Sequence, residues 1–98
     1  MISKTFSAAT QYSAPVFLEQ NKTMAVSLSG AFVGTVQLQR LMKDETDRDY
    51  PAASDSAWAV VSSYTAPVEN QVANGDGCWY RAYCSAYTSG SPVVKLMV

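Results

Sequence analysis

Residues 30–41, GAFVGTVQLQRL, decide the fold of this chain. Apolar and polar side chains alternate along the stretch, with Phe32, Val36 and Leu38 on one parity. A two-residue period is what a half-buried β-strand produces. Gly34 falls on the apolar parity, where a glycine marks a bulge, a bend or the close approach of another segment. The stretch therefore predicts the central strand of a β-sandwich.

Shorter segments on both sides of this stretch also have the composition of strands. They are VFLEQ, TMAVSLSG, AWAVVSSYT, VENQVA, CWYRAYCSAYT and VVKLMV. The last of these is too apolar to be left as a free edge, so it is expected to pair centrally or to be covered by a neighbour. Gly30 separates TMAVSLSG from the central strand, so the two are expected to form a hairpin with Leu28 and Val36 facing one core. No segment predicts a helix longer than a turn or two. The chain is predicted to be all-β, a compact β-sandwich of Greek-key or jelly-roll type with about seven or eight short strands.

The first 14 residues differ from the rest, because Ser, Thr and Ala dominate them and large side chains are few. They are predicted to form an N-terminal arm or an edge strand, with residues 15–98 as the sandwich domain. Phe6 and Tyr12 are the large aromatic side chains of this segment. In an arm, both would contact a neighbouring subunit.

Composition limits the classes of function. Only 15% of the 98 residues are charged, against about 25% in ordinary soluble domains. The net charge is −1 and Lys and Arg do not cluster, which argues against a nucleic-acid partner. No stretch is apolar enough for a transmembrane helix or a signal peptide, which argues against a membrane partner. A small core with few charges predicts association with other chains.

Chemically reactive residues are scarce. The chain has no histidine, and most of its carboxylates lie in the segment 43–55, which is predicted to be a solvated loop. That loop lacks the spacing of an EF-hand. Cys78 and Cys84 lie about 20 Å apart on one extended strand, too far for a disulfide. We expect no enzyme activity, no cofactor and no metal.

The segment CWYRAYCSAYT carries the candidate contact residues. Cys78, Tyr80, Ala82 and Cys84 share the parity expected to face the core. The opposite face then presents a row of three outward residues, spaced two apart in the sequence: Trp79, Arg81 and Tyr83. Trp, Tyr and Arg are the usual anchors of protein interfaces, although an Arg between aromatics on an open sheet face is also ordinary stacking. Together with Phe6 and Tyr12, these three form the predicted interface.

One pattern extends along most of the chain. It comprises an aromatic residue at 32, GTV at 34–36, LQR at 38–40, Trp58, Tyr64–Thr65, YRA at 80–82, YTSG at 87–90 and the final VVKL. This order resembles a pattern in small structural proteins of tailed bacteriophages. The chain differs from that pattern in having Phe32 where a tryptophan is usual, and a long acidic insertion where a short turn is usual.

The resemblance implies a virion protein that is assembled in the host cytoplasm. The most concrete expectation is a capsid decoration, or cement, protein that binds the major capsid protein, bridges capsomers and forms a homo-oligomer such as a trimer. A head–tail joining or tail component is the first alternative. The second is a glycan-binding adhesion module that uses the rings of Trp58, Trp79, Tyr83 and Tyr87. Stacking on a sugar needs exposed rings, however, and the parity of its segment places Trp58 in the core.

Overall fold

The computed structural model describes residues 2–41, 58–74 and 77–98. These residues form nine strands and no helix, and so no helix that could cross a membrane. The strands are β1 (Ile2–Thr5), β2 (Gln11–Tyr12), β3 (Val16–Leu18), β4 (Lys22–Ser29), β5 (Phe32–Leu41), β6 (Ala59–Tyr64), β7 (Val68–Asn74), β8 (Cys78–Gly90) and β9 (Val93–Met97). The predicted acidic loop 43–55 lies outside the described residues.

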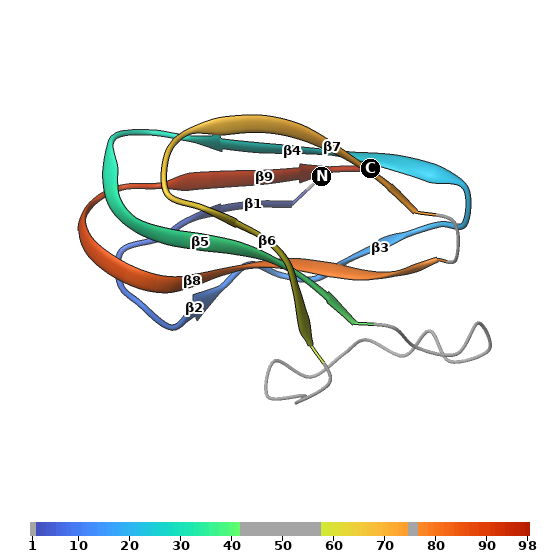
Figure 1. Ribbon diagram of the computed structural model, residues 1–98, viewed down its shortest axis with the longest axis horizontal. Helices are drawn as coiled ribbons and strands as arrows, with labels where there is room; N and C mark the ends of the chain where they lie inside the picture. The colour runs from blue at the N-terminus through green and yellow to red at the C-terminus, as the bar shows by residue number, and fades with distance from the viewer. Residues whose placement is uncertain (1, 42–57, 75–76) are drawn as a thin grey trace.

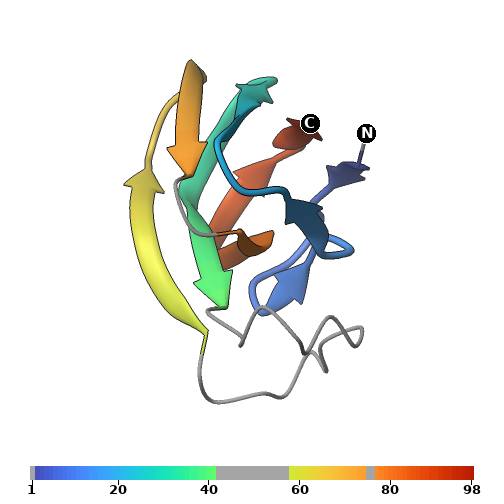
Figure 2. The same cartoon turned by 90° about the vertical axis from the view of Figure 1, so that its right-hand side faces the viewer.

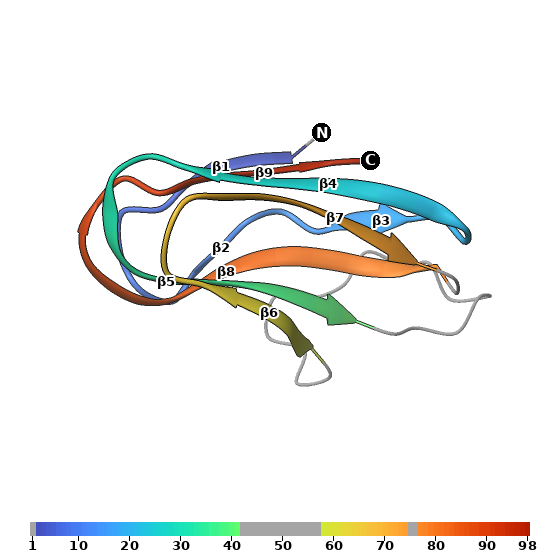
Figure 3. The same ribbon diagram turned by 45° about the horizontal axis from the view of Figure 1, so that its top comes forward.

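The strands form two antiparallel sheets that pack face to face, as the all-β prediction requires (Figures 1 and 3). Sheet A has the order β1-β9-β4-β7, and sheet B has the order β2-β8-β5-β6 with β3 also paired to β8. The chain changes sheet between β1 and β2, on each side of β4, between β6 and β7, and on each side of β8. Such crossings are typical of Greek-key and jelly-roll sandwiches. The described residues form nine strands rather than seven or eight, because the N-terminal segment contributes the short strand β2 in addition to β1.

Most of residues 30–41 form β5, an interior strand of sheet B between β8 and β6. Val36 and Leu38 are buried in the core, as their parity predicts. At Gly34 the register with β8 shifts, and a Cβ atom there would collide with the carbonyl oxygen of Ala86. The glycine therefore marks both a bulge and a close backbone approach.

The hairpin predicted around Gly30 is wrong. β4 lies in sheet A and β5 in sheet B, so the chain crosses the sandwich at this point instead of turning back within one sheet. Gly30 has a φ of 96° and packs against the backbone of Ser91, where β8 crosses to β9 in the same way. Leu28 and Val36 do face one core, but from opposite sheets.

The N-terminal segment is an integral part of the sandwich. β1 is an edge strand paired with β9, so of the two predicted alternatives the edge strand is the one observed. Phe6, which follows β1, has no exposed surface and lies in the core. The assignment of Phe6 to an interface was wrong, because its ring fills the space between the sheets.

The C-terminal half follows the predicted pattern closely. Cys78, Tyr80, Ala82 and Cys84 of β8 all point into the core, and the two cysteines are thiols, not a disulfide. β9 lies between β1 and β4, which gives its apolar side chains a neighbour on both sides. This central position agrees with the expectation that so apolar a strand would not be left as a free edge.

Candidate interaction surfaces

Arg81 is the centre of a polar and aromatic cluster on the outer face of sheet B. Its side chain is only 5% exposed although it points away from the core. The Nε atom donates a hydrogen bond of 2.7 Å to Oε1 of Gln39 on the neighbouring strand β5. The guanidinium carbon lies 4.1 Å from the ring centre of Tyr12 and 4.3 Å from that of Trp58. Two rings from distant parts of the chain therefore enclose one cation. We call Tyr12, Gln39, Trp58, Arg81 and Tyr83 the Arg81 cluster.

Neighbouring side chains hold this cluster in place. Tyr83 stacks on Tyr12 with ring centres 4.8 Å apart. The amide nitrogen Nε2 of Gln39 donates to Oε1 of Gln37 at 3.2 Å, which orients the oxygen of Gln39 toward Arg81. The cluster is thus a fixed arrangement and not a set of independent surface side chains.

Two hydrogen bonds between the N-terminal segment and β8 position Tyr12. The backbone N–H of Ser13 donates to the carbonyl oxygen of Ala82, and the backbone N–H of Ala82 donates to Oγ of Ser13, both at 2.8 Å. Ser13 is buried, so these bonds are shielded from water. These two hydrogen bonds hold Tyr12 next to the outward residues of β8.

Four of the five residues predicted for the interface lie on this outer face. Tyr12 is 38% exposed, Trp79 and Tyr83 are half-buried, and Arg81 is buried. Trp79 packs edge-on against Phe17, with ring centres 5.4 Å apart, beside the Arg81 cluster. The fifth residue, Phe6, is in the core.

Two members of the Arg81 cluster, Gln39 and Trp58, were not among the five residues predicted for the interface. Gln39 lies on the polar parity of residues 30–41, but a single sequence does not tell which strand faces it. Trp58 was expected in the core because of its parity, and it lies on the outside of sheet B instead. That prediction was wrong because Val60, on the same parity, pairs with the outward-facing Gln39.

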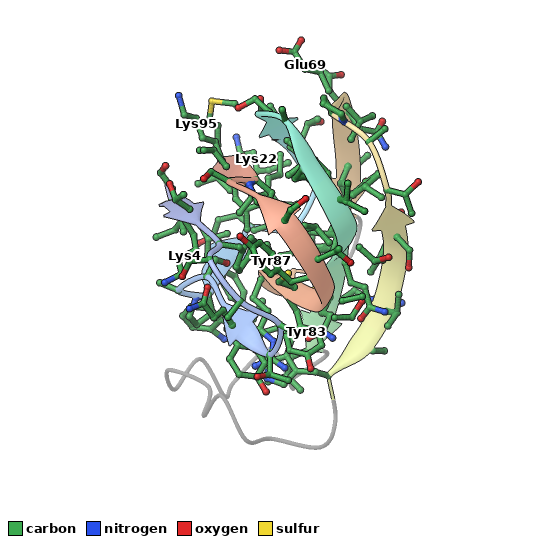
Figure 4. All side chains as sticks on the ribbon, turned by 90° about the vertical axis from the view of Figure 1, so that its left-hand side faces the viewer. Lys4, Lys22, Glu69, Tyr83, Tyr87 and Lys95 are labelled. Atoms are coloured by element: carbon green, nitrogen blue, oxygen red, sulfur yellow. The ribbon has the colours of Figure 1, made fainter. Side chains whose placement is uncertain are left out.

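The outer face of sheet A carries a second feature, an open groove of about 630 Å³. Ala25 and Ser27 of β4 form its floor, because their short side chains leave space between the longer ones on both sides. Ser27 pairs with Glu69 of β7 and with Lys95 of β9, so an acid and a base project on opposite sides of the floor (Figure 4). One row further along, Ala25 lies between Gln71 and Met97.

The core contains one polar contact with a consequence for pH. Burial, followed by a hydrogen bond with Cys78, raises the pKa of Tyr80 to about 12, and the nearby Arg40 partly opposes this shift. Burial also raises the pKa of the Cys84 thiol. A raised thiol pKa disfavours the nucleophilic thiolate.

Within residues 2–41, 58–74 and 77–98, no three His, Cys, Asp or Glu side chains come together to hold a metal ion.

Comparisons of the chain with protein-family models, with curated proteins and with solved structures found no match.

Proposed function

We propose that this chain is a virion structural protein of a tailed bacteriophage, and specifically a capsid decoration protein. The observation that carries the proposal concerns the residues on which the resemblance rests. GTVQLQR lies on β5 and YRA…YTSG lies on β8, and these strands pair along almost their whole length. Residues far apart in the sequence pattern thus form one continuous structure.

Three elements of the pattern have a structural task in that pair of strands. Gln39 of LQR binds Arg81 of YRA. Gly34 of GTV allows the close approach of the backbone next to Tyr87. The hydroxyl of Tyr87 donates to the carbonyl oxygen of Gly90 at 2.6 Å, within YTSG. A pattern whose parts support one another in this way is what a shared fold would preserve, so the arrangement supports kinship with the phage proteins.

In this role the protein would bind the major capsid protein on the outside of the head and link adjacent capsomers. No catalytic step and no cofactor is needed. Each contact is modest, and an oligomer gains strength because a second contact forms at high effective concentration once the first is made. The low charge of the chain suits a surface that is covered by other subunits.

A head–tail joining or tail component remains the alternative within the same class, because the pattern does not specify a position in the virion. Glycan binding is less favoured. Trp58 stacks on Arg81 and Trp79 packs against Phe17, so these rings already contact other side chains instead of presenting a free platform for sugars.

The test is binding to phage heads assembled without the protein. Purified protein should co-sediment with such heads to a fixed ratio and raise their melting temperature, and heads of an unrelated tailed phage should show neither effect. Absence of binding to heads, together with binding to tails or connectors, would replace the decoration role with the alternative. Absence of binding to any virion part would overturn the proposal.

A pair of variants locates the contact. Tyr12→Ala removes the exposed ring of the Arg81 cluster, whereas Tyr12→Phe retains it. We expect the first variant to bind heads more weakly than the second, with both folded by circular dichroism. Equal binding would exclude the Arg81 cluster as the contact, while leaving the decoration role intact.

A further inference from the structure

The outer strands on the two sides of the sandwich differ in how well they are protected against pairing with another chain. On one side, the outer strands are β1, which carries Lys4, and the short β2 and β3 with Pro15 between them (Figure 2). Short strands, lysine and proline are the usual means by which proteins prevent pairing with another chain at a sheet edge. On the other side, the outer strands are β6 and β7. Among the described residues, no strand pairs with the outer edge of either.

β7 presents the more regular of these two open edges. It pairs with β4 residue for residue from Val68 to Asn74, without a register shift. The backbone N–H of Gln71 donates to the side-chain oxygen Oδ1 of its neighbour Asn70 at 2.9 Å, so this donor is turned away from β4. In an antiparallel ladder, the N–H and C=O groups of one residue point to the same side. Gln71, at the middle of β7, therefore directs both groups to the outer edge, where an incoming strand would replace Oδ1 of Asn70 as the acceptor of the N–H.

From this geometry we propose that two copies of the chain pair through β7, antiparallel, about a two-fold axis at Gln71. The two Gln71 residues would exchange both backbone hydrogen bonds as a directly opposed pair. The same register places Glu69 opposite Ala73 of the partner subunit, so the acids do not meet. Sheet A would then continue through both copies as one eight-stranded sheet.

Strand β6 adds apolar surface on the same side of the sandwich. Val60 is 53% exposed and Val61 is 40% exposed. Both residues are adjacent to a register shift between β5 and β6, and Val61 has no partner on β5. A bulge weakens edge pairing at this point, so β7 supplies the hydrogen bonds and the two valines supply buried area.

This pairing is independent of the virion role, although it would supply the self-association that the decoration role uses. Pairing through β7 yields a two-fold dimer. Each copy uses its β7 edge in the contact, so this edge cannot add a third copy. A trimer, as the resemblance implies, would need a different surface.

The experiment introduces charged side chains at position 71, which in the proposed dimer lies on the two-fold axis opposite residue 71 of the other copy. Gln71→Glu and Gln71→Lys each place two like charges against one another, and Gln20→Glu and Gln20→Lys make the same changes at an exposed residue outside any strand. Light scattering of the wild type and of both Gln20 variants should give twice the 10.6 kDa of one chain. Each Gln71 variant alone should be monomeric, and an equimolar mixture of the two should regain the dimer mass because opposite charges then meet.

Several outcomes would overturn the proposal. A monomeric wild type would do so, as would a trimeric one, and a dimer that persists in each Gln71 variant would place the interface elsewhere. Failure of the mixture to dimerise would exclude a two-fold axis at Gln71. Hydrogen exchange gives an independent measurement, in which the amide of Gln71 should become protected as the wild-type concentration rises. Head binding is a separate assay, so failure of the dimer leaves the decoration role to be judged on its own.

Discussion

The contact between Arg81 and Gln39 can be measured by a double-mutant cycle. Arg81→Met keeps most of the apolar length of the side chain, but it removes a hydrogen bond to a charged group, worth about 1.5–3 kcal/mol. It also removes a cation from between two rings, worth about 0.5–1 kcal/mol for each ring. Because Met recovers part of the buried area, we expect the free energy of unfolding to fall by about 2–4 kcal/mol. A domain of this size has about 5–15 kcal/mol in total, so the variant should still fold.

The cycle separates the hydrogen bond from the stacking. Gln39→Leu and the double variant complete it, and urea unfolding can be followed through the fluorescence of Trp58 and Trp79, which lie in or beside the Arg81 cluster. We expect a coupling energy of about 1–2 kcal/mol between Arg81 and Gln39, because each substitution breaks the same bond. If the two single effects add to within about 0.3 kcal/mol, the two side chains do not act together, and the argument for a fixed cluster is refuted.

Three further predictions concern the core and the strand pairing. Phe6→Ala should lower the free energy of unfolding by about 3–5 kcal/mol in chemical denaturation; a loss below about 1 kcal/mol would mean that the N-terminal segment is dispensable. Gly34→Ala should cost about 1–3 kcal/mol and lower the melting temperature, because the added Cβ meets the backbone of β8; an unchanged melting temperature would contradict the close approach. Between pH 10 and 12 the unfolded chain loses the Tyr80 proton while the fold retains it, so stability should fall with rising pH by up to about 2.7 kcal/mol. Tyr80→Phe should remove that part of the pH dependence, and identical profiles for the variant and the wild type would exclude Tyr80 as its source.

The two-residue period explains why so much of the fold could be predicted. In residues 30–41 and 78–84 one parity is almost entirely apolar, and a strand in a sandwich has only two faces to choose from. The same reasoning failed at Gly30. A tight reversal with positive φ is needed whether the chain turns within a sheet or crosses to the other one, so the local sequence cannot distinguish a hairpin from a crossing.

Phe6 and Trp58 show a second limit. Phe6 has no large apolar neighbour at a spacing of two, only Lys4 and Ala8, so nothing local indicates that its ring fills the core. Parity relates Trp58 to the other residues of its own segment, but it does not say which face of the sheet is buried. That depends on the pairing of β6 with β5.

The candidate contact surface was predictable in part for a similar reason. The outward row of β8 follows from parity, and three of its expected members do lie on the outer face of sheet B. Gln39 lies 42 residues from Arg81 in the sequence, and Tyr12 is further away still. Such partners are set by the order and register of the strands, which a single sequence does not encode in any local pattern.

The central position of β9 in sheet A also affects how the chain can fold. β9 is synthesised after every strand that it joins, and it must insert between β1 and β4. Until β9 inserts, β1 has no neighbour in sheet A, and the inner face of sheet B remains partly uncovered. Of the nine strands, β9 therefore leaves the ribosome last, and the sandwich depends on this strand to complete its core. Pairing between strands that are far apart in the sequence, such as β1 and β9, is slow to form, so we expect folding over milliseconds to seconds, with closure of sheet A as the final event.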